Sequence, residues 1–167
     1  FGAELVEATI EHVDFTHRPF TVWTDSGSHQ AKSVIVATGA SAKLIGIESE
    51  TSLMGFGVSA CATCDGFFFR GKRVMVIGGG DTAMEEANYL TRFCEEVVVV
   101  HRRDSLRASK IMQERALANP KIRFIWDSEV TEVLGVAERK VRGVMLRNIK
   151  TGAITEHAID GVFVAIG

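Results

Sequence analysis

The sequence predicts an α/β fold built around a β-α-β unit, and two observations support it. Arg73–Ile77 and Glu96–Val100 are short apolar runs rich in β-branched residues, as buried strands are. Between them, residues 82–93 place apolar side chains at helical spacing. The unit spans about thirty residues, the length of one crossover. Residues 107–117 and 122–126 carry the same two patterns, so a second helix and a third strand are expected to follow.

The segments before this unit are expected to be extended. Residues 4–15 and 20–24 are enriched in β-branched side chains, and residues 25–28 (Asp-Ser-Gly-Ser) are a turn signal. Residues 31–37 end in Val-Ile-Val-Ala and run into Thr38-Gly39, which predicts a short buried strand that stops at the glycine. We therefore expect a β-meander followed by a strand.

Two kinds of segment complete the chain. Residues 41–57 show little periodicity and are expected to hold a domain boundary. Residues 130–136, 141–148 and 154–159 are predicted to be antiparallel strands, and residues 161–166 form a last apolar run. The later part of the chain is thus expected to be β-rich.

The composition is that of an ordinary globular protein, with 46% hydrophobic and 24% charged residues. A length of 167 residues allows one domain, or one domain and part of another. The net charge of −2 gives no overall reason to bind nucleic acid or an anionic membrane. No apolar run approaches the ~18–20 residues that span a bilayer. The sequence starts at Phe1 without a signal-peptide pattern, and we expect a fragment at both ends.

The turn after the first strand of the unit has the pattern Gly78-x-Gly80-x-x-Ala83. The first glycine permits the tight turn, the second lets backbone N–H groups approach a pyrophosphate, and the small third residue lets helix and strand pack closely. The phosphates would lie at the helix N-terminus. A glycine-rich junction that binds nothing fits the same letters. Because a strand and a helix flank the turn, a Rossmann-like dinucleotide site is favoured.

Basic residues follow the second strand, where an NAD site would carry an Asp or Glu for the ribose 2′-OH. Here the sequence has His101-Arg102-Arg103, and Arg107 follows four residues later. Guanidinium groups form charge-assisted bonds to a phosphate, whereas a carboxylate would repel it. We therefore expect NADPH rather than NADH. The alternative is a solvated charge run in which Asp104 pairs with an arginine.

Two of the three cysteines form Cys61-Ala-Thr-Cys64. Such a pair can form a disulfide across one turn, and one of its thiolates can be stabilised as a nucleophile. Asp65 follows at once, and its carboxyl could exchange the proton that thiol–disulfide exchange requires. Half of a zinc site is the competing interpretation, but Cys94 lies far away in a helical pattern. A redox pair in a reducing cytoplasm is favoured, and no metal site is expected.

Three motifs follow one another along the chain: Ser59-Ala-Cys-Ala-Thr-Cys-Asp-Gly66, Val76-Ile-Gly-Gly-Gly-Asp-Thr-Ala-Met-Glu-Glu-Ala87 and His101-Arg-Arg-Asp-Ser-Leu-Arg107. In this order and spacing they resemble the low-molecular-weight thioredoxin reductases, and the resemblance covers essentially the whole chain. Related hydroperoxide-reductase flavoproteins share the architecture but usually carry Cys-Pro-His-Cys. The Cys-Ala-Thr-Cys form therefore favours thioredoxin reductase.

The resemblance implies a homodimeric flavoprotein in which NADPH reduces FAD, FAD reduces the cysteine pair, and the dithiol reduces thioredoxin. Cys61 would attack the thioredoxin disulfide, Cys64 would face the flavin, and Asp65 would be the acid/base. The other positions that the family's motifs mark would bind the pyrophosphate, the 2′-phosphate or FAD, and they are Gly78, Gly80, Asp81, Thr82, Ala83, His101, Arg102, Arg103, Arg107, Thr38 and Gly39.

The resemblance also implies an NADPH-binding domain inserted into an FAD-binding domain. Residues 1–42 would be part of the FAD-binding domain, residues 43–160 the NADPH-binding domain with the redox pair, and residues 161–167 the return to the FAD-binding domain. The family's N-terminal glycine-rich FAD turn and C-terminal Gly-Asp segment are missing from the sequence, so the chain alone is expected to be inactive. A hydroperoxide-reductase flavin subunit and a non-catalytic NADP-binding module remain the alternative functions.

Overall fold

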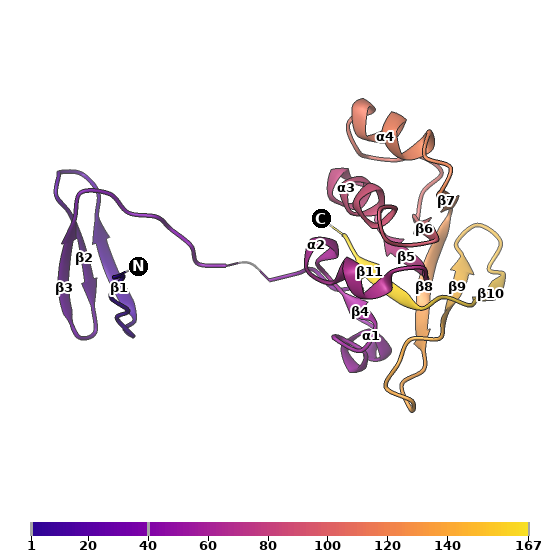
Figure 1. Ribbon diagram of the computed structural model, residues 1–167, viewed down its shortest axis with the longest axis horizontal. Helices are drawn as coiled ribbons and strands as arrows, with labels where there is room; N and C mark the ends of the chain where they lie inside the picture. Colours follow the sequence, from indigo (N-terminus) through magenta and orange to yellow (C-terminus); the bar gives the residue numbers. More distant parts are fainter. Residues whose placement is uncertain (1, 40, 167) are drawn as a thin grey trace. The chain divides into compact units, whose positions relative to one another are not determined.

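The computed structural model describes residues 2–39 and 41–166, so that residues 1, 40 and 167 lie outside it (Figure 1). The chain divides into two compact units, Phe1–Ser41 and Ala42–Gly167. The first holds one three-stranded sheet, and the second holds a five-stranded and a three-stranded sheet. The predicted return segment at residues 161–167 therefore ends on a residue that the structure does not describe.

The first unit is the predicted β-meander. Its strands β1 (Ile10–Asp14), β2 (Phe20–Thr24) and β3 (Gly27–Ala31) pair antiparallel in sequence order (Figure 1). Thr24 pairs with Gly27, so the turn between β2 and β3 is the two-residue loop Asp25-Ser26. Short loops of this kind connect neighbouring antiparallel strands, as the turn signal predicts.

The buried strand predicted over residues 31–37 is wrong. Strand β3 ends at Ala31, and residues 33–39 are in neither strand nor helix. Ile35 is 90% exposed and Val36 71% exposed. A strand requires a neighbour that accepts its backbone hydrogen bonds, and among the described residues none pairs with this segment.

The second unit is built on a parallel sheet with the strand order β4-β11-β5-β6-β7. Its strands are β4 (Val58–Ser59), β11 (Gly161–Val164), β5 (Arg73–Ile77), β6 (Glu96–Val100) and β7 (Ile122–Ile125). Helix α3 (Asp81–Leu90) connects β5 to β6, and helix α4 (Lys110–Leu117) lies between β6 and β7. The predicted β-α-β unit is confirmed, and β11 is the second neighbour of β5.

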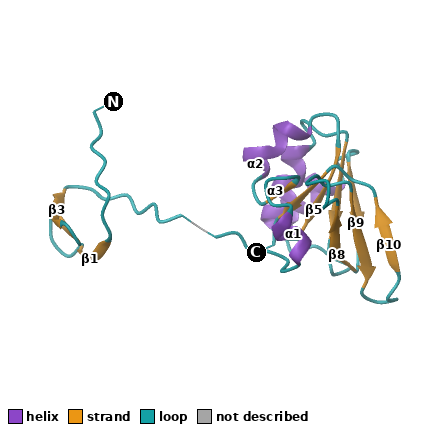
Figure 2. Cartoon of the chain, turned by 90° about the horizontal axis from the view of Figure 1, so that it is seen from below, coloured by secondary structure: helices purple, strands orange, loops and turns teal. Residues whose placement is uncertain are grey.

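Strand β5 is buried on both faces because its side chains alternate between two cores. Val74 and Val76 belong to a core that includes the α3 residues Ala83, Met84, Ala87 and Leu90. Met75 and Ile77 belong to a second core that includes Val130, Val133, Val144 and Leu146 of the other sheet. Figure 2 shows α3 and this other sheet on opposite sides of β5. Burial on both faces explains the continuous apolar run in the sequence.

The second sheet of this unit is antiparallel, in the order β10-β9-β8. Strands β8 (Ser128–Leu134), β9 (Gly143–Asn148) and β10 (Ile154–His157) lie within or close to the predicted segments. A two-versus-one irregularity interrupts the β8–β9 register between Val130 and Glu132. The unit thus has three layers, with α3 and α4 on one face of the parallel sheet and this antiparallel sheet on the other.

Strand β4 and three short helical elements were not predicted. Helix α1 (Glu48–Ser52) lies in the segment expected to be a linker, and α2 (Ala62–Asp65) is followed directly by a 3-10 turn, η1 (Gly66–Phe69). The buried carboxylate of Glu50 holds α1 in place by accepting hydrogen bonds from the N–H groups of Ile45 and Gly46, both at 2.9 Å. None of the helices in the described ranges has the length and apolarity needed to cross a membrane.

Candidate functional site

The glycine turn lies between the end of β5 and the start of α3, where both neighbours crowd it. Gly78 donates its N–H to the Val100 carbonyl at 3.1 Å and has a φ of +149°. A Cβ at Gly78 would overlap the Ala165 carbonyl oxygen and would lie 2.9 Å from the Cβ of Ala83. Ala83 is itself fully buried. Strand and helix therefore pack as closely as the sequence pattern requires.

Gly79 and Gly80 have different surroundings. The Gly79 carbonyl accepts hydrogen bonds from the N–H groups of Arg107 (2.7 Å) and Ala108 (3.1 Å), and a Cβ at Gly79 would lie 2.5 Å from Nδ1 of His101. A Cβ at Gly80 would meet nothing within 4 Å. Gly80 is the N-cap of α3 and has no side chain to satisfy the first N–H groups of the helix. The space in front of these donors is open.

A pocket of about 520 Å³ opens in front of this turn. Most of the sequence-predicted nucleotide residues line it, namely Gly78, Gly80, Asp81, Thr82, His101, Arg102, Arg103 and Arg107. Ala83 lies beneath the turn and does not line it. The residues of the wall that sequence analysis missed include Lys43, Ile45, Ser128, Glu129 and Val130. They come from other layers of the fold, and no local pattern marks them.

The three arginines of this pocket are exposed, and within residues 2–39 and 41–166 none of them has an ion-pair partner. The alternative in which Asp104 pairs with an arginine is wrong, because Asp104 pairs with Lys150 at 3.3 Å. Positive charge at the mouth of the pocket is therefore available to an anion.

His101 is buried at the back of the pocket. The backbone N–H of His101 donates to the Ile125 carbonyl at 3.0 Å, and its backbone carbonyl accepts a hydrogen bond from the Ser128 N–H at 3.1 Å. The residue is 8% exposed. Burial lowers the pKa of the imidazole below its usual 6.5, and the nearby Arg103 and Arg102 lower it further. The Nε2 atom has no hydrogen-bond partner among the described residues. The ring is therefore mainly neutral at pH 7, and its Nε2 is a buried polar atom beside Gly79.

Asp81 and Thr82 occupy the first turn of α3. The Asp81 carboxylate accepts hydrogen bonds from the backbone N–H (2.7 Å) and the hydroxyl (2.9 Å) of Ser109, which is the N-cap of α4. Asp81 thereby ties the starts of the two helices together. Thr82 is exposed on the pocket wall. A direct bond from either side chain to a nucleotide remains a prediction.

The two predicted redox cysteines are joined as a disulfide with an S–S distance of 2.04 Å. Cys61 is the N-cap of α2, and its sulfur accepts a hydrogen bond from the Cys64 N–H at 3.2 Å. Cys64 is exposed, whereas Cys61 is half-buried, and the half-buried Asp65 is the last residue of α2. The structure thus brings Cys61, Cys64 and Asp65 into one helical turn, separate from the residues that line the pocket.

Glu86 connects α3 to the disulfide helix, and sequence analysis missed it. Its Oε1 accepts a hydrogen bond from the Ala62 N–H at 3.4 Å, and its Oε2 is buried without a partner among the described residues. Burial raises the pKa of this carboxyl above 4.5, although the bond from Ala62 opposes the shift. A signal was present in the sequence, because Glu86 shares a helix face with the apolar Ala83 and Leu90.

The predicted FAD-contacting residues lie in the other unit. Thr38 and Gly39 are exposed, and neither of the two described pockets includes them. Their contact with a flavin remains a prediction. Within the described parts of the chain, no cluster of three or more His, Cys, Asp or Glu side chains is placed to hold a metal ion.

Comparison with known proteins places this geometry in a family. The pyridine nucleotide-disulphide oxidoreductase family matches residues 3–167. Thioredoxin reductase from Streptomyces coelicolor is 54% identical over 168 residues, which cover 100% of this chain and 52% of that protein. Thioredoxin reductase from Rickettsia conorii is 51% identical, with 99% of this chain and 54% of that protein covered. The chain therefore spans about half the length of these curated relatives.

Solved structures agree with the sequence comparison. Thioredoxin reductase from Streptococcus pyogenes matches with a TM-score of 0.79 and 48% identity, covering 96% of this chain and 52% of that one. The enzyme from Giardia duodenalis matches with a TM-score of 0.84 and 36% identity, covering 99% and 54%. The chain belongs to the pyridine nucleotide-disulphide oxidoreductase family, and over its whole length it is similar to thioredoxin reductases.

Proposed function

We propose that this chain is the nucleotide-binding and disulfide-bearing part of an enzyme that reduces thioredoxin with NADPH through FAD. One observation carries the proposal: a single folded unit holds a Cys61–Cys64 disulfide and a glycine-turn pocket lined by three arginines. The relatives that carry the name thioredoxin reductase support the choice of substrate. We further propose a cytoplasmic homodimer as the whole protein.

The nucleotide would bind with its pyrophosphate at the start of α3. The N–H groups there are free of a side-chain cap, and the open space at Gly80 admits a phosphate. The 2′-phosphate would meet Arg102, Arg103 and Arg107 through charge-assisted bonds. The neutral, buried His101 would support the glycine turn without adding charge, and Ala83 would support it from below.

The domain organisation follows from the same proposal. Residues 1–42 would belong to an FAD-binding domain, with Thr38 and Gly39 beside the flavin, and residues 43–160 would bind NADPH. The division of the chain between Ser41 and Ala42 supports the first boundary. Residues 161–167 would lead back to the FAD-binding domain. Because β11 pairs with β5, we place the return after Val164.

The chain's own cysteines would carry the electrons to thioredoxin. When FAD is bound, it converts the hydride of NADPH into a form that a disulfide accepts. The Cys61–Cys64 bond takes up two electrons and two protons and becomes a dithiol. The Cys61 thiolate then attacks one sulfur of the thioredoxin disulfide, and Cys64 attacks Cys61 in the mixed disulfide. Reduced thioredoxin leaves, the Cys61–Cys64 bond re-forms, and Asp65 exchanges the protons.

The order of the two cysteines rests on the resemblance to the family. In this structure Cys64 is the more exposed of the two. Replacing each cysteine by Ser, in a protein that joins this chain to flavin-binding segments, tests the order. Formation of a mixed disulfide with thioredoxin should require Cys61, and this mixed disulfide should accumulate in Cys64→Ser. Accumulation in Cys61→Ser instead would reverse the assignment.

Nucleotide titration of the 167-residue chain tests the cofactor. We expect NADPH to bind at least about tenfold more tightly than NADH, because bonds to charged groups contribute ~1.5–3 kcal/mol. Arg102→Ala should remove most of this preference, and Arg115→Ala, on the exposed face of α4, should leave it intact. Gly80→Ala should weaken both nucleotides without loss of fold. Equal affinity of the unmodified chain for NADPH and NADH would refute the cofactor assignment.

A further inference from the structure

We infer that Lys150 is a positioning residue for 2′-phosphate recognition, because it holds two carboxylates away from the arginines of the pocket. The inference rests on the proposed binding of NADPH and extends it. Sequence analysis gave Lys150 no role, and it does not line the pocket. It acts through its neighbours rather than by touching the nucleotide.

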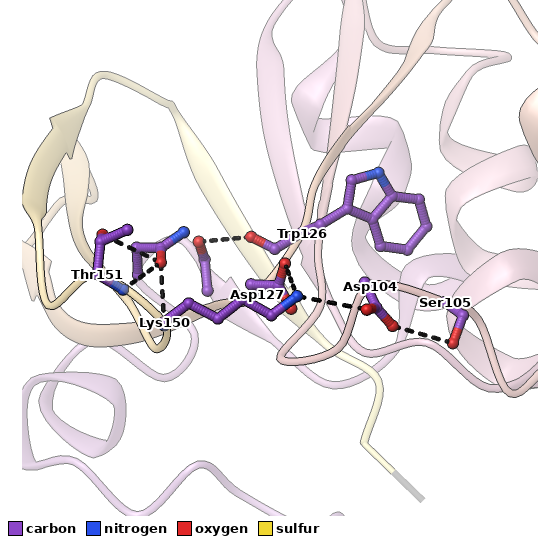
Figure 3. A network of polar contacts seen from close by, with 8 residues as sticks. Asp104, Ser105, Trp126, Asp127, Lys150 and Thr151 are labelled. Carbon is purple, nitrogen blue, oxygen red and sulfur yellow. Dashed lines mark hydrogen bonds and ion pairs between the residues drawn. The ribbon is translucent and has the colours of Figure 1, made fainter.

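The Lys150 ammonium bridges two aspartates from different loops (Figure 3). Its Nζ lies 2.9 Å from Asp127 Oδ2 and 3.3 Å from Asp104 Oδ2. Asp104 follows β6, Asp127 lies between β7 and β8, and Lys150 lies in the turn between β9 and β10. Three segments of the fold therefore converge on one positive charge.

The turn that carries Lys150 is built to hold it. Asn148 Oδ1 accepts hydrogen bonds from the N–H of Lys150 (3.0 Å), the N–H of Thr151 (2.9 Å) and the Thr151 hydroxyl (3.1 Å). Figure 3 shows these bonds at the backbone end of Lys150, with the ammonium group extending away toward Asp127 and Asp104. The Ile149 N–H donates to the Asp127 carbonyl at 2.6 Å. The backbone is thus fixed on both sides of the lysine.

Both aspartates adjoin the arginine loop. Asp104 follows Arg103 directly in the chain, and the Asp127 N–H donates to the Arg103 carbonyl at 3.2 Å. Asp127 has a φ of +50°, and its carboxylate pairs with Lys150. A change in what these carboxylates pair with therefore alters the local charge beside Arg102 and Arg103.

The charge balance of the loop depends on the lysine. Hydrogen bonding to Lys150 holds the pKa of Asp104 below its usual value, and bonding to Asp127 raises the pKa of Lys150. The ammonium group thus compensates the negative charge of both carboxylates. Without the lysine, they would either pair with Arg103 and its neighbours or repel an incoming phosphate dianion. Both outcomes oppose a 2′-phosphate specifically, because a nucleotide without this group brings no charge to that place.

The experiment compares 2′,5′-ADP with 5′-AMP as ligands of the 167-residue chain, by calorimetry at low ionic strength. We expect Lys150→Met to weaken 2′,5′-ADP about fivefold, the effect of exposed charge pairs, and to leave 5′-AMP unchanged. Lys150→Arg should retain the selectivity. Lys140→Met is the matched control, because it removes one exposed lysine that has no ion-pair partner among the described residues.

A second set of variants separates charge from structure. In the Lys150→Met background, Asp104→Asn together with Asp127→Asn removes the uncompensated charges and should restore the affinity for 2′,5′-ADP. If Lys150 only stabilised the turn, the neutral aspartates would restore nothing, and this outcome would overturn the inference. Unchanged selectivity in Lys150→Met would also overturn it. If the unmodified chain lacked a preference for 2′,5′-ADP, the cofactor assignment itself would fail and this inference with it.

Discussion

The imidazole of His101 occupies the place where a side chain on Gly79 would stand: a Cβ there would lie 2.5 Å from Nδ1 and 2.6 Å from Nε2. The end of β6, which leads into the arginine loop, therefore packs against Gly79 in the middle of the glycine turn. The Gly79 carbonyl adds two hydrogen bonds from Arg107 and Ala108. The glycine turn and the basic loop are thus one packed structure, although nearly thirty residues separate Gly79 from Arg107.

Replacing Gly79 by Ala should destabilise the second unit, because the buried ring of His101 must move. We expect a loss of about 1–3 kcal/mol in the free energy of unfolding, as for other overpacked sites. Urea denaturation followed by Trp126 fluorescence in a Trp23→Phe background isolates this unit, since Trp23 lies in the first one. Gly80→Ala is the matched control and should cost little, because its Cβ has space.

A double variant shows whether His101 is the cause. His101→Ala removes the ring, so the added methyl of Gly79→Ala should cost less in that background than in the unmodified chain. Equal costs in the two backgrounds would mean that the methyl group acts elsewhere.

The continuous apolar runs located the longer strands of the parallel sheet, but not the two-residue strand β4. The predicted ranges Arg73–Ile77 and Glu96–Val100 are the observed bounds of β5 and β6. The same kind of run failed at residues 31–37, because an apolar segment becomes a strand only where a neighbour pairs with it. Helix α1 could not be predicted, because its five residues are too few to show a helical period and a buried carboxylate fixes it.

The pocket residues that belong to contiguous sequence motifs could be predicted from the sequence. The glycine turn and the basic loop are each a contiguous pattern, and the chain order of a β-α-β unit brings their ends to one edge of the sheet. Glu86 and Lys150 act through partners that are 24 and 46 residues away. Such pairings depend on how layers pack, which no spacing in one sequence encodes.

The buried His101 should make the stability of the second unit depend on pH. Its pKa in the folded protein lies below 6.5, so as the pH falls past 6.5 the unfolded chain gains a proton that the folded chain does not. The free energy of unfolding should therefore fall, by about 1 kcal/mol at most between pH 7 and 5.5. His101→Gln should flatten this part of the profile. His157→Gln is the control, and an identical slope in His101→Gln would contradict the prediction.

Glu86 should change the pH dependence of the free energy of unfolding in the opposite direction to His101. Its pKa in the folded protein is raised by burial, so the charged form that prevails at pH 7 costs stability, and this cost disappears as the pH falls toward 4.5. Glu86→Gln keeps the acceptor for the Ala62 N–H and removes the charge. It should raise the free energy of unfolding at pH 7 by a few tenths to about 1 kcal/mol, because solvent screens a half-buried group. Glu85→Gln, on the exposed side of α3, should have no such effect.

The three cysteines should separate by reactivity with an alkylating reagent at pH 8. The oxidised folded chain should take up almost none, because Cys61 and Cys64 are joined and Cys94 is 1% exposed. Burial also raises the pKa of the Cys94 thiol to about 11, so almost no thiolate exists there at pH 8. After mild reduction, two cysteines should react quickly, and the third should react only in urea.

Mass spectrometry of peptides identifies the modified residues, and Cys94→Ala should remove the slow class without changing the fast one. The result bears on the redox role, because only a pair of cysteines that can form a disulfide takes up two electrons reversibly. The lone Cys94 has no such partner among the described residues. Fast labelling of Cys94 in the folded, oxidised chain would show that α3 and the strand after it open together. In that case the helix that carries Glu86 and the glycine turn would not be the rigid support that nucleotide binding and the disulfide share.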